Sequence, residues 1–141
     1  MSHLRPRAIL AAVALTLLGS ACGGSGTTTP AAPTTTSPTT ETFASVITAQ
    51  GAAFRVFAVS QAGTVSVTLV SDGPPTIPFG LGVGVRAGAT GCNLNTAVNT
   101  MPGDTAQITV PVDAGSYCTG IYDIGNVPPG GVNFSVRIVH P

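Results

Sequence analysis

The chain has 141 residues, which is enough for one domain after any export segment is removed. Charged residues make up only 7% of it and the formal net charge is zero, so the composition does not provide the basic surface that binds a nucleic-acid backbone. Its apolar residues are scattered between Thr and Ser among 18 Gly and 12 Pro, which favours a β-rich extracellular domain over a helical bundle.

Residues 1–21 have the three parts of a bacterial secretory signal peptide. Arg5 and Arg7 give a positively charged start, Ala8 to Leu18 form an uncharged apolar run, and small residues follow. As a helix, this run would rise about 16 Å, roughly half the hydrocarbon thickness of a bilayer. The segment is therefore too short for a permanent membrane span, and we predict that it directs export.

Cys22 follows this segment directly. The stretch Leu18-Gly19-Ser20-Ala21-Cys22 resembles the processing site of bacterial lipoproteins, although the commonest form has Leu where this chain has Gly19. The resemblance implies that the Cys22 thiol is lipidated and that three acyl chains hold the protein firmly, since each buried methylene contributes roughly 0.8 kcal/mol. The alternative is an ordinary signal peptide followed by a chance Cys. We predict an exported envelope protein that is lipid-anchored to a membrane, with the leaflet left open.

A tether is expected from Cys22 to Glu41. Residues 23–41 read GGSGTTTPAAPTTTSPTTE, and these Thr and Pro residues leave almost nothing that a core could bury. Fully extended, the segment would reach roughly 60 Å. Such a composition is also typical of stalks that carry O-linked sugars, and both interpretations stay open.

Residues 42–141 contain short stretches in which apolar and polar residues alternate, separated by clusters of Gly, Pro and Asp. Alternation with period two and many β-branched residues predicts half-buried strands, and the clusters predict turns. Strands are expected at Phe43–Ile47, Phe54–Val59, Thr64–Leu69, Phe79–Val85, Thr105–Val110, Tyr117–Tyr122 and Val132–Ile138. Seven or eight strands without an apolar helical period predict an all-β fold, an antiparallel two-sheet sandwich.

Every second residue between Phe79 and Val85 is Gly. A lane of glycines on one face of a strand indicates either that a neighbouring segment crowds this face or that the strand is a tolerant, exposed edge. The edge is the simpler interpretation and is the one expected here.

Three stretches of the sequence resemble parts of a known family. The opening hairpin of bacterial pre-peptidase C-terminal domains is similar to the stretch from Phe54 to Leu69. The closing pair of strands of that family is similar to the stretches from Ala114 to Asp123 and from Phe134 to Ile138. The resemblance implies a jelly-roll-like sandwich that accompanies a secreted enzyme and is not itself catalytic. Members often carry acidic residues in a middle region that here, from Pro75 to Val85, has no carboxylate, so no calcium site is expected.

Three Cys is an odd number for an exported protein. If Cys22 carries lipid, Cys92 and Cys118 remain as a pair, and an oxidising compartment favours a disulfide between them. The alternative is a metal site, but His140 is the only His after the signal peptide and zinc normally takes four ligands. We therefore predict a disulfide, with no metal and no cofactor.

The titratable residues do not suggest catalysis. Glu41 ends the tether, while Asp72, Asp104 and Asp113 fall in turn signatures, where Asp caps backbone amides. His140 lies near the C-terminus, where chains fray, so a surface position is expected for it. Neither a base with an orienting acid nor a facing pair of carboxylates is indicated, so we predict that the protein is not an enzyme.

Candidate ligand-binding residues cluster around one expected strand. Tyr117 and Tyr122 have opposite parity, so one of the two rings should face outward, and Asp123 and Asn126 follow directly. Exposed rings beside hydrogen-bonding side chains are a common way for a sandwich to bind sugars. We predict a non-catalytic, lipid-anchored module of the cell envelope that interacts with an envelope protein or glycan or has a structural role. A carbohydrate-binding module of the cell surface is the alternative.

Overall fold

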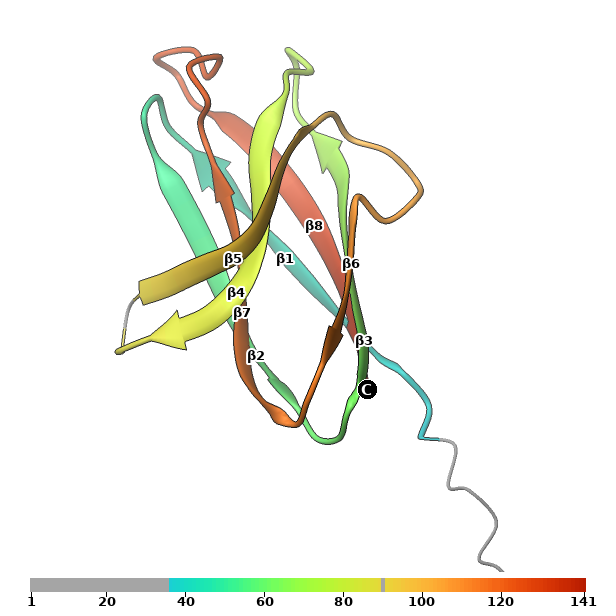
Figure 1. Cartoon of the computed structure of the whole chain (residues 1–141). Coiled ribbons are helices and arrows are strands. Elements are labelled where there is room, and N and C mark those ends of the chain that lie inside the picture. Colours follow the sequence, from blue (N-terminus) through green and yellow to red (C-terminus); the bar gives the residue numbers. More distant parts are fainter. Residues whose placement is uncertain (1–35, 90) are drawn as a thin grey trace, which may run out of the picture. The chain divides into compact units, whose positions relative to one another are not determined.

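The computed structural model describes residues 36–89 and 91–141 (Figure 1). Within this range the chain forms eight strands and no helix. Among the described residues, there is no helix that is long and apolar enough to cross a membrane. The predicted signal peptide, Cys22 and most of the predicted tether lie outside the described residues.

The eight strands form two four-stranded sheets. They are β1 (Thr39–Ile47), β2 (Ala52–Val59), β3 (Gly63–Asp72), β4 (Phe79–Ala87), β5 (Gly91–Thr100), β6 (Ile108–Val112), β7 (Gly115–Tyr122) and β8 (Val132–His140). Sheet A has the order β1-β8-β3-β6 and sheet B the order β2-β7-β4-β5, and all neighbouring strands are antiparallel. This eight-stranded double sheet has the jelly-roll arrangement, so the predicted all-β sandwich is confirmed.

The core lies between the two sheets and follows the alternation in the sequence. Val65, Val67 and Leu69 on β3 are fully buried, and the same period of two appears on β4 and β8. The inward side chains of these last two strands are Phe79, Leu81, Val83, Val132, Phe134, Val136 and Ile138. Burial of each such side chain stabilises the fold by roughly 1.5–3 kcal/mol, which makes this layer the main source of stability.

Several expected boundaries differ from the observed ones by two or more residues, and the two that matter most are those of β6 and β1. β6 covers Ile108–Val112 rather than Thr105–Val110. β1 begins at Thr39, so the last three residues of the expected tether belong to the sandwich. They are held there because Thr39 pairs with His140 in the antiparallel ladder between β1 and β8, a partner that lies at the far end of the sequence.

His140 is buried, so the expected surface position is wrong. Its imidazole stacks on Phe57 with ring centroids 5.2 Å apart, and its Nε2 lies 3.2 Å from Glu41 Oε1. The other oxygen of this carboxylate lies 3.3 Å from Arg55 Nη2. Glu41 on β1 therefore connects both β8 of its own sheet and β2 of the facing sheet, and this side of the sandwich is closed.

β4 is an interior strand, so the expected edge position is also wrong. It lies between β7 and β5 in sheet B, and its glycines are buried. A Cβ at Gly82 would meet Leu94 Cδ1 at 2.7 Å, and a Cβ at Gly84 would collide with the Asn93 carbonyl. Gly82 and Gly84 thus mark the place where β5 bends across the outer face of sheet B.

The predicted disulfide is present and holds this bend. It joins Cys92 on β5 to Cys118 on β7, two strands that lie on opposite sides of β4. In a flat sheet, strands two places apart would be separated by roughly 9.5 Å, whereas these two Cα atoms are 5.8 Å apart. The start of β5 therefore folds over β4 toward β7, as the crossing of β5 in front of β4 in Figure 1 shows.

Candidate functional site

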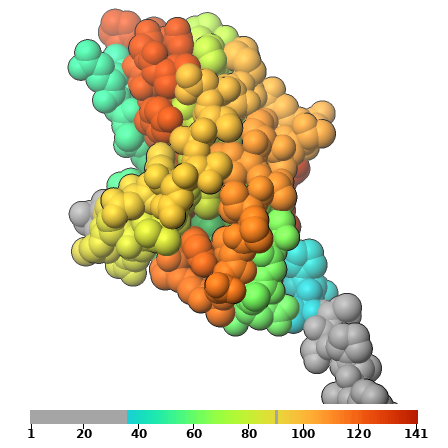
Figure 2. Space-filling model, viewed as in Figure 1, coloured from blue at the N-terminus to red at the C-terminus, as the bar shows by residue number. Residues whose placement is uncertain are grey.

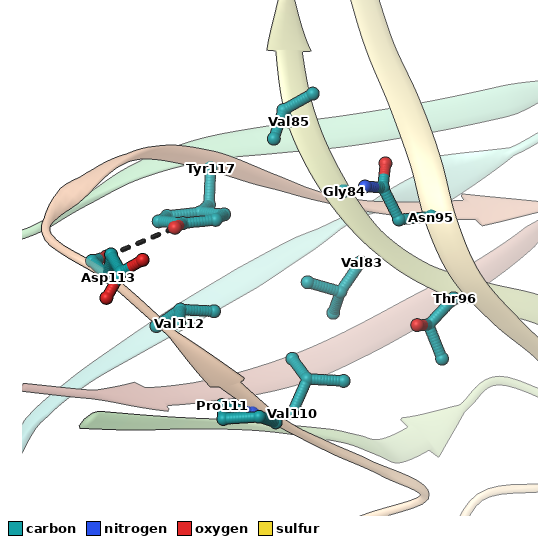
Figure 3. Close-up of a pocket in the computed structure, with 10 residues that line it drawn as sticks. All are labelled: Val83, Gly84, Val85, Asn95, Thr96, Val110, Pro111, Val112, Asp113 and Tyr117. Atoms are coloured by element: carbon teal, nitrogen blue, oxygen red, sulfur yellow. Dashed lines mark hydrogen bonds between the residues drawn. The ribbon is translucent and has the colours of Figure 1, made fainter. Parts of the chain in front are cut away.

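A pocket of about 340 Å³ lies between β5 and β6, the neighbouring edge strands of the two sheets (Figure 3). We call it the lateral pocket. Figure 2 shows the surface of the face on which β5 crosses in front of β4. The residues that line the lateral pocket are Val83, Gly84, Val85, Asn95, Thr96, Val110, Pro111, Val112, Asp113 and Tyr117. It opens on the side of the sandwich opposite to the one that Glu41 closes.

The floor of the lateral pocket is aliphatic. Val83 and Val85 both have the inward parity of β4, yet Val83 is 3% exposed and Val85 is 43% exposed. The facing sheet ends here in β6, a strand of only five residues. The short edge strand thus leaves the last inward side chain of β4 uncovered, and apolar surface becomes accessible.

Two polar residues of β5 line the lateral pocket, and one of them, Asn95, does so because the strand contains a bulge. Val83 pairs with Thr96 and Gly84 pairs with Leu94, so Asn95 is an extra residue without a partner in β4. A bulge bends its strand and redirects the side chain that it carries. Asn95 and Thr96 both line the pocket in Figure 3, where they come from β5 and face the valines of β4 and β6.

Tyr117 forms a fixed wall of the lateral pocket. Its ring stacks on Phe57 with centroids 6.2 Å apart, and its hydroxyl donates a hydrogen bond to the backbone oxygen of Asp113 at 3.1 Å. The dashed line in Figure 3 marks this bond. Because both ends of the side chain are held, the ring needs no ordering when a ligand binds beside it.

The four residues that the sequence singled out do not form one site. Tyr117 lies at the start of β7 and Tyr122 at its end, a separation of roughly 17 Å along the strand. Their predicted opposite parity is confirmed, since Tyr117 packs on the core while the ring of Tyr122 covers Gly80 on the outer face of sheet B. Asp123 and Asn126 lie beyond Tyr122, away from the lateral pocket.

Asp123 organises the loop that follows β7. Its Oδ1 accepts hydrogen bonds from the backbone N–H groups of Gly125, Asn126 and Val127 at 2.7, 2.8 and 3.0 Å. Its Oδ2 accepts one from the N–H of Gln50 at 2.8 Å. These bonds, that of Gln50 first, lower the pKa of Asp123 from 3.8 to about 2, while desolvation opposes the shift. The carboxylate is thus engaged within the fold.

Replacement of Asp123 should change the response of the protein to acid. A carboxyl whose pKa is lower in the folded state than in the unfolded state stabilises the fold at pH values above its ordinary pKa of 3.8. This stabilisation is lost as the pH falls toward the folded-state pKa of about 2. We expect Asp123→Asn to have a lower melting temperature than the wild type at pH 6. As the pH falls from 4 to 2, the difference between the two melting temperatures should become smaller. Thermal unfolding of the full chain at a series of pH values measures this. A gap that stays constant over the whole range would contradict the prediction.

Asp72 has the turn role that was expected, because its Oδ2 accepts the N–H of Ile77 at 2.8 Å. Asp104 and Asp113 contribute backbone oxygens instead, to Arg137 and Tyr117 respectively. Among the described residues, no group of three or more His, Cys, Asp or Glu side chains has a metal-binding arrangement.

Sequence reasoning missed Asn95 and Thr96, because no strand was expected between residues 91 and 100. The alternation of this segment is broken at the bulge, and its Asn residues are rare in strands. A signal was nevertheless present in the glycines of β4. They indicated that some segment crowds that strand, and this segment is β5.

Comparison with known proteins yields a fold and no family. No protein-family model matches the sequence, and no curated protein matches it. Among solved structures, the chain is similar to the crystal structure of the Yersinia pseudotuberculosis-derived mitogen, with a TM-score of 0.51 and 13% identity over 74% of this chain and 87% of that one. At this identity the likeness shows the fold alone. The resemblance to pre-peptidase C-terminal domains stays a prediction.

Proposed function

We propose that this protein is a non-catalytic binding module of the bacterial cell envelope and that the lateral pocket is its binding site. The observation that carries the proposal is the contrast between two sets of polar side chains. Asp123, Glu41 and His140 are engaged in hydrogen bonds within the fold. Asn95 and Thr96, in contrast, are exposed side chains on the wall of a pocket with an aliphatic floor.

The lateral pocket has the composition of a ligand site rather than that of a catalytic centre. Binding sites are mostly apolar concavities with a few convergent polar groups, commonly of about 300–1,000 Å³, and the volume of about 340 Å³ falls at the lower end of that range. Its lining includes one carboxylate, that of Asp113, and no cationic side chain. A neutral group of the partner therefore fits better than an anionic one.

The anchor is the second part of the proposal. Cys22 would carry the lipid, and the Thr- and Pro-rich residues that follow would act as a spacer between the membrane and the sandwich. Mass spectrometry of the mature N-terminus tests this part by itself. An acylated Cys22 is expected, and an unmodified amino end would contradict the anchor without affecting the pocket.

Carbohydrate binding is the second candidate, and the position of Tyr117 favours it. A fixed aromatic ring next to an amide and a hydroxyl offers the apolar surface and the hydrogen bonds that a neutral sugar needs. In this form of the proposal the glycan binds in the lateral pocket, and the Asp123 end of β7 is not involved.

The proposal is tested with the full chain and two matched variants. Val85→Arg places a long charged side chain at an exposed valine in the lateral pocket, and Val46→Arg does the same at an exposed valine on β1. We expect retention of a protein or glycan from solubilised envelopes to fall at least about tenfold for Val85→Arg, a loss of roughly 1.4 kcal/mol, and to be unchanged for Val46→Arg.

Val85→Arg, together with a second variant, Asn126→Ala, separates the two candidate functions on an array of neutral glycans. A signal that Val85→Arg removes and Asn126→Ala leaves intact would support carbohydrate binding in the lateral pocket. Retention of an envelope protein with no glycan signal would favour the general binding module. If the wild type retains nothing, or if both arginine variants bind like the wild type, the pocket is not the site.

A further inference from the structure

β5 is an edge strand whose only protective feature is the bulge at Asn95. It has ten residues, and none of them is charged or a proline. Within the described residues, β4 is the only strand that pairs with it. In an antiparallel ladder, half of the backbone N–H and C=O groups of an edge strand point away from its neighbour, so β5 presents a row of them on its free side.

The other three edge strands are shielded in recognisable ways. β6 has only five residues, and one of these is Pro111, which cannot donate a hydrogen bond. β1 and β2 each carry a charged residue, and the ion pair between Glu41 and Arg55 joins the two across the sheets. Natural proteins use short edges, prolines and charges to prevent strand pairing between molecules. The free edge of β5 has none of these features.

The part of β5 that is available for pairing lies beyond the bulge. Before the bulge, the strand is held against the outer face of sheet B by the disulfide of Cys92 and by Leu94, which packs over Gly82. From Thr96 to Thr100 the strand continues in regular register with β4. Ala97 and Asn99 are exposed on the outer face of this stretch.

We propose that β5 pairs with β5 of a second copy of this chain, antiparallel and across a two-fold axis, so that two copies of sheet B become one eight-stranded sheet. An isologous contact of this kind places each residue of one copy opposite a residue of the same strand, so like charges would oppose it. β5 has no charge, and its Asn and Thr side chains are both donors and acceptors, so they can satisfy one another across the axis. This pairing goes beyond the proposed function, and the pairing stretch shares only Thr96 with the lateral pocket.

The expected result is a reversible dimer. Sedimentation equilibrium of the full chain, in detergent with micelles in excess over protein, should show an average mass that rises from one chain toward two as concentration increases. Ala97→Lys combined with Asn99→Lys places two positive charges on the pairing edge of each copy and should return the mass to that of one chain. The control is Thr42→Lys combined with Ala44→Lys, at two exposed alternate positions of β1, which should leave the dimer intact.

Charge complementation sharpens this test. Mixing the lysine variant of β5 with Ala97→Glu combined with Asn99→Glu should restore a dimer that contains one copy of each. Hydrogen exchange of the wild type provides a measurement that needs no variant. Those amides of residues 96–100 that point to the free side of β5 should exchange more slowly at concentrations where the mass is doubled.

Three results would overturn the proposal. The first is an average mass equal to that of one chain up to about 1 mM protein, where even a weak contact of roughly −4 kcal/mol would be half formed. The second is a dimer that survives the lysine substitutions on β5. The third is hydrogen exchange at residues 96–100 that does not depend on protein concentration. Ligand binding is tested with Val85→Arg on β4, whereas the dimer is tested with substitutions at Ala97 and Asn99 on β5. A failure of one proposal is thus distinguishable from a failure of the other.

Discussion

Replacement of Cys92 and Cys118 together by serine is expected to lower the free energy of unfolding by about 3.5 kcal/mol. The bridge closes a loop of 26 residues, and opening it returns that conformational freedom to the unfolded chain. In addition, β5 loses the bond that holds it across β4. For a domain of about 100 residues, a change of this size lowers the melting temperature by on the order of 15–25 °C.

Thermal unfolding of the full chain with and without a reductant measures this effect. The wild type should unfold at a lower temperature once it is reduced, and the double serine variant should be insensitive to the reductant. Both forms should still fold, because the residues of the core are unchanged. Equal melting temperatures for the wild type in the two conditions would refute a stabilising role for the bridge.

Gly84→Ala is expected to destabilise the domain by about 3 kcal/mol or more, at the upper end of what overpacking costs. A methyl group at this position would collide with the carbonyl of Asn93, which is backbone and cannot rotate out of the way. Either β5 moves away from β4 or the ladder between the two strands distorts. Gly130→Ala is the matched control, because no atom lies within 4 Å of the Cβ that it adds.

Chemical denaturation of the two glycine variants gives the comparison. Gly130→Ala should unfold within about 0.5 kcal/mol of the wild type, and a Gly84→Ala protein as stable as the wild type would show that β5 does not press on β4. The effects of Gly84→Ala and of the double serine substitution on the free energy of unfolding should also be non-additive. Gly84 is the register partner of Cys118, and once the disulfide is absent β5 can move, so the added methyl group should cost less than it does in the oxidised protein.

The alternation of apolar residues was sufficient to predict the sandwich. Val65, Val67 and Leu69 show why, since a period of two assigns both a strand and its buried face in one step. The pairing of Cys92 with Cys118 followed from a count of cysteines. That the bridge spans β4 did not follow from it, because this depends on which strands are neighbours in sheet B.

What the sequence could not predict depends on contacts between distant residues. Asp123 was placed among the candidate ligand-binding residues, and its carboxylate accepts a bond from Gln50, 73 positions earlier. His140 was expected at the surface, and it packs under Glu41, 99 positions away. β5 was missed because its bulge at Asn95 interrupts the pattern by which strands are recognised, and the lateral pocket was missed with it.

The pairing of the first strand with the last has a consequence for biogenesis. β1 has β8 as its neighbour in sheet A, and Thr39 is opposite His140, so the ladder of β1 cannot close until β8 has left the ribosome. Domains with such long-range pairings fold slowly, because a long loop must close before the contacts can compensate for its entropy. In a chain that emerges with its N-terminus first, sheet A is therefore completed only after β8 has been synthesised.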